Sequence, residues 1–159
     1  MPASVSRRPE LSSDSSFLRQ LIVSHAAAQL GADSWPEPMR SHLLATQYSA
    51  RLASIRENFP GAVSEIIVAD GQNAGWLVLA FGDDEVRVIE MLVQVEFRNK
   101  GIGTRILREV FASADHQHRP VRLHVRTDNL AAIRLYERVG FQSLEAGDLQ
   151  QLMERQPSK

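Results

Sequence analysis

The chain of 159 residues contains no cysteine. Disulfide bonds and thiolate metal sites are therefore excluded, and no reaction can proceed through an acyl group held on a cysteine. A basic excess is missing as well, because 18 lysines and arginines are balanced by 19 aspartates and glutamates, which leaves a formal net charge of −1. Since general nucleic-acid binders normally carry a clear basic excess, the composition argues against nucleic acid as a partner.

Long apolar stretches are also missing. The longest, at 76–81, is far too short to cross a bilayer, and residues 1–8 do not resemble the start of a secretory signal. We therefore expect a soluble, cytoplasmic protein without a membrane partner. Hydrophobic residues still make up 43% of the chain, which is enough for a core. The length, with no repeat or low-complexity linker, predicts a single domain over residues 1–159.

The spacing of apolar residues changes along the chain. Helical spacing at 16–30 and 38–58 gives way to β-rich runs at 66–69, 75–81 and 86–95, which indicate an antiparallel meander. The remaining predicted elements are a weak strand around Val5, a helix after Gly103, a strand at 121–125, a helix at 129–139 and a closing hairpin of 141–144 with 149–153. The order β-α-α-β-β-β-α-β-α-β-β is that of a mixed α/β chain with one central sheet.

The clearest local signal is the turn at 98–104, between a predicted strand and a predicted helix. Gly101 and Gly103 let the backbone turn tightly and expose its amides. The helix that follows begins with unpaired N–H groups and the positive end of its dipole, so the turn is expected to attract a phosphate or pyrophosphate. The alternative is a structural glycine turn with exposed basic residues, because short glycine motifs often match by chance.

Two other phosphate-binding loops do not fit this turn. A Walker A loop needs lysine after its last glycine, but Lys100 precedes the glycine pair. A Rossmann fingerprint needs a third glycine where Ile106 stands.

A second group of spaced residues lies downstream, across a predicted helix that ends at Gly140. Asn129 can cap this helix, and Tyr136 follows about two turns later. With the turn, this group resembles the GNAT superfamily of N-acetyltransferases. The matches are Arg98-x-x-Gly101-x-Gly103, its acetyl-CoA signature, and Asn129-x-x-Ala132-x-x-x-Tyr136-x-x-x-Gly140-Phe141. The resemblance covers about 86–141, and Val95 departs from it where the family often has proline.

The resemblance implies the GNAT fold, a mixed, mostly antiparallel sheet of six to seven strands flanked by about four helices. It implies an N-acetyltransferase that transfers acetyl from acetyl-CoA to a primary amine of a small molecule or peptide, by direct attack in a ternary complex. A non-catalytic acyl-CoA sensor on the same fold is the alternative. Family members often pair, so a homodimer is compatible with it, and no metal is implied.

The resemblance also implies roles for individual residues. Tyr136 would act as general acid at the sulfur, and Asn129 would order the cofactor arm. The backbone of Leu92 and Val93 would bind the pantetheine arm. The pyrophosphate would be bound by the amides of Arg98, Asn99, Lys100, Gly101, Ile102, Gly103 and Thr104.

Glu90 is the candidate general base, and this inference comes from the residues themselves. It interrupts an apolar central strand, where an unpaired carboxylate is expensive. A catalytic role and an ion pair with Arg87 or Arg122 each account for it. A strand histidine such as His124 is more often structural. The acceptor itself is not encoded in any motif, so polyamines, antibiotics, amino acids and protein N-termini all stay open.

Overall fold

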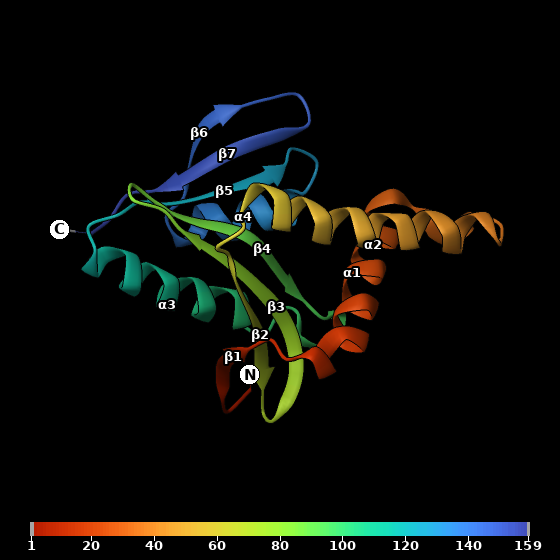
Figure 1. The fold of residues 1–159 in the computed structure, drawn as a ribbon. Coiled ribbons are helices and arrows are strands. Elements are labelled where there is room, and N and C mark those ends of the chain that lie inside the picture. Colours follow the sequence, from red (N-terminus) through yellow and green to blue (C-terminus); the bar gives the residue numbers. More distant parts are fainter. Residues whose placement is uncertain (1, 159) are drawn as a thin grey trace.

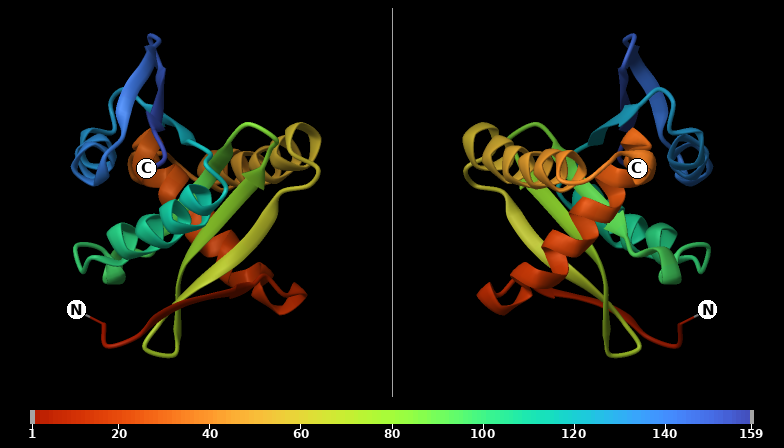
Figure 2. Two further views of the ribbon diagram at one scale, coloured as in Figure 1. Left: turned by 90° about the vertical axis from the view of Figure 1, so that its left-hand side faces the viewer. Right: turned by 90° about the vertical axis from the view of Figure 1, so that its right-hand side faces the viewer.

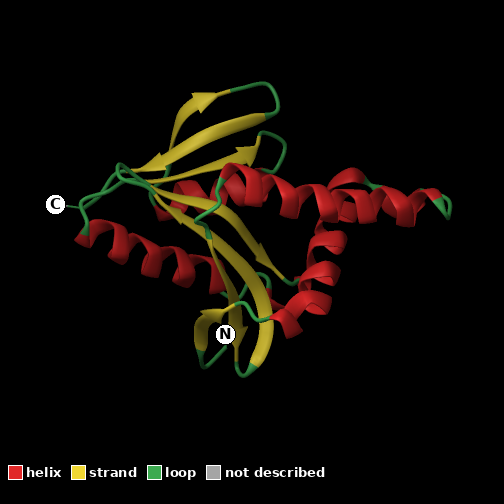
Figure 3. Ribbon diagram, viewed as in Figure 1, coloured by secondary structure: helices red, strands yellow, loops and turns green. Residues whose placement is uncertain are grey.

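The computed structural model describes residues 2–158. Within them, a seven-stranded sheet is flanked by four α-helices (Figures 1 and 3). The strands are β1 (Val5–Pro9), β2 (Val63–Ala69), β3 (Gln72–Phe81), β4 (Val86–Val93), β5 (Val121–Arg126), β6 (Gln142–Ala146) and β7 (Gln150–Arg155). The helices are α1 (Ser15–Leu30), α2 (Met39–Asn58), α3 (Ile102–His116) and α4 (Leu130–Val139). The predicted fold class and element order are confirmed.

The strands lie in the order β1-β2-β3-β4-β5-β7-β6. All neighbours are antiparallel except β4 and β5, which are parallel because α3 crosses between them. Helices cover the sheet from both sides (Figure 2). One core cluster joins α3 and α4 to the sheet, and a second joins α1 and α2 to its other face. No helix in residues 2–158 is long and apolar enough to span a membrane.

A β-bulge interrupts β4 next to β3. Val78 pairs with Glu90, but the next residue of β3, Leu79, pairs with Val88, so Ile89 is the extra residue. A bulge lets two consecutive side chains project to the same face. Ile89 accordingly packs in the α1–α2 cluster, and Glu90 contacts α2, while Met91 packs in the α3–α4 cluster.

The parallel strands β4 and β5 separate after a short paired stretch. Their register covers only three residue pairs and ends at Val88 with Leu123. From 89 to Val93, β4 continues without a partner in β5. The sheet is therefore forked at its centre, directly before the glycine turn.

Each strand of the meander differs from the prediction in one boundary. β2 begins at Val63 rather than at 66. β3 begins at Gln72 rather than at 75, because Asp70 and Gly71 alone make the turn, both at positive φ. β4 ends at Val93 rather than at 95, because Val95–Phe97 forms a short 3-10 turn that leads into the glycine segment.

Candidate functional site

A cleft of about 480 Å³ lies where β4 and β5 separate. Its wall comes from β4, the turn at 98–104, the first turn of α3 and one side of α4, with His25 added from α1. The residues of the predicted site that line it are Leu92, Val93, Arg98, Asn99, Gly101, Ile102, Gly103, Thr104, Asn129 and Tyr136. Lys100 and Glu90 do not. The Lys100 ammonium instead lies 5.8 Å from the centre of the Phe97 ring.

The glycine turn brings the start of α3 to the cleft. Asn99 and Gly101 have φ angles of 60° and 80°, the left-handed region that asparagine and glycine tolerate best. The first intrahelical bond runs from the Arg105 N–H to the Gly101 carbonyl over 3.0 Å. The amides of Ile102 to Thr104 precede it, so they have no partner within the helix. These donors, at the positive end of the helix dipole, form a potential anion site.

Gly103, in the first turn of α3, faces α4 and β4. A Cβ atom on it would be 3.2 Å from Leu135 Cδ2 and 3.7 Å from Met91 Cε. Both atoms are ends of flexible side chains, so a small residue could be accommodated by slight shifts. A larger side chain would project into the space between the helices and the cleft.

Along the forked part of β4, backbone groups alternate between β3 and the cleft. The Gln94 N–H donates to the Ala74 carbonyl of β3 over 2.8 Å, so the backbone groups of Leu92 also point to β3. Those of Met91 and Val93 face the cleft, and the Val93 carbonyl accepts a hydrogen bond from Arg98 Nε over 2.9 Å. The cleft-facing backbone groups are thus those of Met91 and Val93, while Leu92 lines the cleft without offering such groups.

Helix α4 carries Tyr136 to the cleft. The Asn129 side chain accepts from the Ala132 N–H over 3.3 Å and caps the helix. Tyr136 is 9% exposed, and its ring packs edge-on against Phe141 with 5.5 Å between centres. Burial raises the pKa of the Tyr136 hydroxyl to about 12, and the negative charge of Glu90 acts in the same direction. The hydroxyl is therefore protonated at neutral pH.

Glu90 has a different partner from those predicted. Its Oε1 lies 3.5 Å from Nε of Arg51 on α2, and its side chain is 18% exposed. The expected partners are occupied elsewhere, since Arg87 bonds Glu85 over 2.8 Å and Arg122 bonds Glu154 over 2.6 Å. The sequence could not reveal the pair, because the bulge and the packing of α2 bring its members together. Burial raises the pKa of Glu90, whereas the Arg51 charge opposes that shift.

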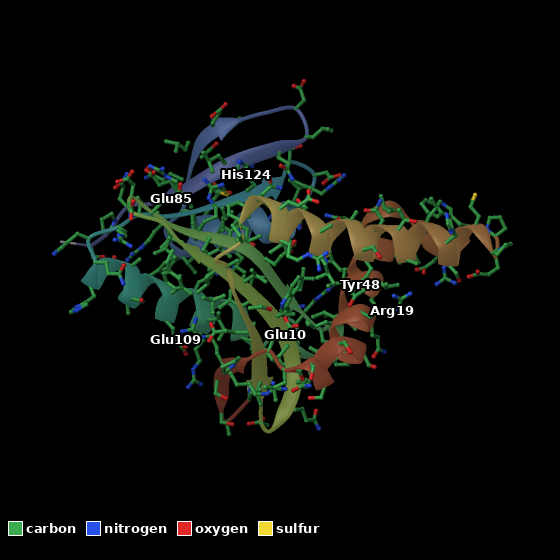
Figure 4. The ribbon with its side chains drawn as sticks, viewed as in Figure 1. Glu10, Arg19, Tyr48, Glu85, Glu109 and His124 are labelled. Carbon is green, nitrogen blue, oxygen red and sulfur yellow. The ribbon has the colours of Figure 1, made fainter. Side chains whose placement is uncertain are left out.

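The histidines differ in their surroundings. His25 lines the cleft, and burial lowers its pKa to about 4, with the charges of Arg51 and Arg98 acting in the same direction. Nothing in the sequence singled it out. His124, labelled in Figure 4, is exposed on β5. Its Nδ1 lies 3.1 Å from an Arg87 nitrogen. Within residues 2–158 no group of three or more histidines and carboxylates could hold a metal ion.

Two arginines add positive charge to the cleft. Arg134 and Arg138, one turn apart on α4, both line it. From the sequence alone, an ordinary solvated helix face is the expectation for both arginines, with an approach to the adenosine phosphates as the alternative. Their exposure agrees with that expectation, and their position beside the glycine turn adds to it.

Comparison with known proteins identifies the family. Residues 25–141 match the model of the Acetyltransferase (GNAT) family. The chain therefore belongs to the GNAT family of acetyltransferases, as the resemblance of its two motifs predicted.

Two solved structures share the fold. The PaiA N-acetyltransferase from Thermoplasma acidophilum, in complex with coenzyme A, is 18% identical with a TM-score of 0.73, over 96% of this chain and 99% of that one. Ard1 from Thermoplasma volcanium is 21% identical with a TM-score of 0.67, over 99% and 100%. In sequence, 89 residues are 36% identical to the spore coat polysaccharide biosynthesis protein SpsD of Bacillus subtilis (strain 168). That match covers 54% of this chain and 31% of SpsD.

Proposed function

We propose that the protein transfers the acetyl group of acetyl-CoA to a primary amine by direct attack in a ternary complex. The observation that carries this proposal is the cleft at the fork of the sheet. It brings an amide-rich helix start, an unpaired strand edge and a protonated tyrosine to one cavity. These are the groups that binding a diphosphate, binding an extended thioester arm and stabilising a leaving thiolate require.

The cleft residues fit acetyl-CoA as a ligand. The amides at the start of α3 would hold the pyrophosphate, and Arg98, Arg134 and Arg138 would add positive charge around it. The cleft-facing backbone groups of Met91 and Val93 would bind the pantetheine arm in place of a neighbouring strand. Arg98 would then release the Val93 carbonyl, which it now caps. Acetyl-CoA supplies an activated acetyl group and a thiolate leaving group.

Glu90 is the proposed general base. Because an alkylamine has a pKa of about 10.4, it must lose a proton before it can attack. Glu90 projects to the α1–α2 face, opposite the α3–α4 cluster that contains Tyr136. The amine would approach from that face through the fork, and Glu90 would accept its proton directly or through a water molecule.

Tyr136 is proposed to act on the leaving sulfur. A thiol with a pKa of about 8.5 is a stronger acid than a phenol of pKa about 12. The first contribution of Tyr136 is therefore a hydrogen bond from its hydroxyl to the departing thiolate. When Glu90 takes a proton from the amine, the negative charge that helps raise the pKa of Tyr136 disappears. The hydroxyl then becomes a better proton donor after the base has acted.

The acceptor is proposed as an amine-bearing small molecule or peptide. The local similarity to a polysaccharide biosynthesis protein adds sugar amines to the candidates that a screen should include. A second candidate function is a non-catalytic acyl-CoA sensor. A sensor needs neither a tyrosine close to the sulfur nor a half-buried carboxylate beside the fork, so the site favours the enzyme.

A thiol-release assay tests the proposal. Acetyl-CoA is incubated with a panel of polyamines, amino acids, sugar amines and peptides, and free thiol is measured. We expect saturable release with at least one acceptor. Calorimetric binding of acetyl-CoA without release for any acceptor would support the sensor, and binding of ATP or NAD without coenzyme A would overturn both.

Glu90→Gln tests the base within that assay. We expect kcat/KM to fall by about 10²–10⁴-fold, the usual contribution of a positioned base. Glu137→Gln is the matched control, because Glu137 is exposed on α4. Equal losses in the two variants would remove Glu90 from the mechanism.

A further inference from the structure

The Arg51–Glu90 pair links the longest helix to the fork of the sheet. Arg51 lies in the second half of α2, and Glu90 follows the bulged residue of β4. The two side chains are 23% and 18% exposed, and 3.5 Å separates Arg51 Nε from Glu90 Oε1. The contact therefore lies largely away from solvent, where opposite charges interact more strongly than at the surface.

The fold brings these two charges together from both sides. On β4, the bulge at Ile89 sends Glu90 toward α2 instead of α3 and α4. On α2, Tyr48 lies one turn before Arg51, and its ring is 5.1 Å from the Arg19 guanidinium of α1 (Figure 4). Tyr48 and Leu52 also pack against the α1–α2 cluster. Helix α2 is thus fixed on both sides of Arg51.

The pair is not arranged for maximal stability. Arg51 Nη1 is buried without a hydrogen-bond partner among residues 2–158. Buried polar groups are nearly always hydrogen-bonded, and a buried ion pair of imperfect geometry often stabilises less than apolar side chains of similar size. Stability alone therefore does not account for a guanidinium at this position.

We propose that Arg51 is a positioning residue that keeps Glu90 anionic and oriented at the fork of the sheet. The inference rests on the proposed function, in which Glu90 accepts the proton of the amine. Without Arg51, burial would favour the protonated carboxyl, which cannot act as a base. Arg51 itself touches neither the amine nor the thioester in this scheme.

Three other groups border this region, each from a different element. His25 on α1 is neutral above about pH 4 and adds no charge near neutrality. The Arg98 guanidinium, after β4, is bonded to the Val93 carbonyl. Tyr136 on α4 is neutral until about pH 12. Arg51 is therefore the group whose charge lowers the pKa of Glu90.

The inference is tested by titrating Glu90 directly in the full chain. Carbon-13-labelled glutamate reports each carboxyl by NMR, and E90Q assigns the Glu90 signal. In R51Q we expect the pKa of Glu90 to rise by about one to three units, the usual effect of losing a close opposite charge. R51K should restore most of the original value. R56Q, an exposed arginine on the same helix, should leave it unchanged.

An unchanged pKa of Glu90 in R51Q would overturn the inference. R51M, which keeps the apolar stem of the side chain, is the second variant if R51Q does not fold. The histidine carbon signals are followed in parallel, because loss of the Arg51 charge should also raise the pKa of His25.

Kinetics separate this inference from the proposed function. With the best amine of the acceptor panel, the acid limb of the kcat/KM profile should move to higher pH in R51Q, while KM for acetyl-CoA stays within about twofold. Impaired E90Q with an unshifted R51Q profile would leave the proposed function standing and overturn the role of Arg51. Full activity of E90Q would show that Glu90 is not the general base. The Arg51–Glu90 pair would then have no role in catalysis.

Discussion

The two sides of the forked sheet are built in different ways. On the α3–α4 side, the candidate site uses backbone amides, a strand edge and residues within one continuous segment from β4 to α4. On the α1–α2 side, it uses side chains far apart in the sequence, such as Arg51 and Glu90. Backbone recognition requires glycines at defined spacing and therefore leaves a motif. Side chains that meet from separate helices and strands leave no motif, so the sequence alone does not reveal this side of the site.

Gly103→Asp is the strongest test of backbone recognition on the α3–α4 side. It places a carboxylate against the proposed diphosphate site, and we expect calorimetric affinity for coenzyme A to fall at least about 100-fold, or more than about 2.7 kcal/mol. The neighbouring Leu135 and Met91 side chains can shift, so the variant should fold. Gly103→Ala, the control for bulk alone, should lose far less. Unchanged binding in the aspartate variant would place the ligand elsewhere.

Tyr136→Phe tests the role of a side chain on the α3–α4 side, where the other proposed contacts come from the backbone. Loss of the hydroxyl should lower kcat by about 10–100-fold, because a hydrogen bond to a charged group such as the leaving thiolate contributes about 1.5–3 kcal/mol. The ring contact with Phe141 remains, so stability and cofactor affinity should change little. Steady-state kinetics with calorimetry measure both quantities. Identical kcat values in the wild type and the variant would show that a group other than Tyr136 interacts with the leaving thiolate.

Asp14→Asn tests whether the α1–α2 side can be destabilised without affecting coenzyme A binding on the α3–α4 side. Asp14 precedes α1 and accepts two hydrogen bonds of 2.8 Å from Arg8, and Leu11 N–H donates a third. We expect a loss of about 1–2 kcal/mol in the free energy of unfolding, measured with urea, and unchanged coenzyme A affinity. Asp128→Asn is the control, because its pair with Arg126 is exposed. Equal effects of the two variants would show that the Asp14 contact is no more than a surface pair.

The same contact has a defined pH dependence. Hydrogen bonds from Arg8 and from the Leu11 amide lower the pKa of Asp14 from 3.8 to about 2. Its stabilising contribution is thus complete above about pH 4 and is lost as the pH falls toward 2. In the asparagine variant, the free energy of unfolding should depend less steeply on pH over this interval.

The sequence predicted the element order and the glycine turn because both depend on local spacing. Asn129 as a helix cap and the route from strand to turn to helix follow from neighbouring residues alone. The partner of Glu90 could not be predicted, since strict alternation along a strand does not foresee a bulge at Ile89. His25 was not singled out either, for a different reason: only the packing of α1 against the sheet brings it to the cleft.

The fork has a mechanical consequence. Strands β5, β7 and β6 are joined to the rest of the sheet by three residue pairs between β4 and β5. Few backbone hydrogen bonds therefore hold β5, β7 and β6 to the rest of the sheet. A ligand bound in the fork would contact both parts of the sheet and so stabilise them against separating. Ligand binding should therefore slow amide exchange throughout β5 and β7.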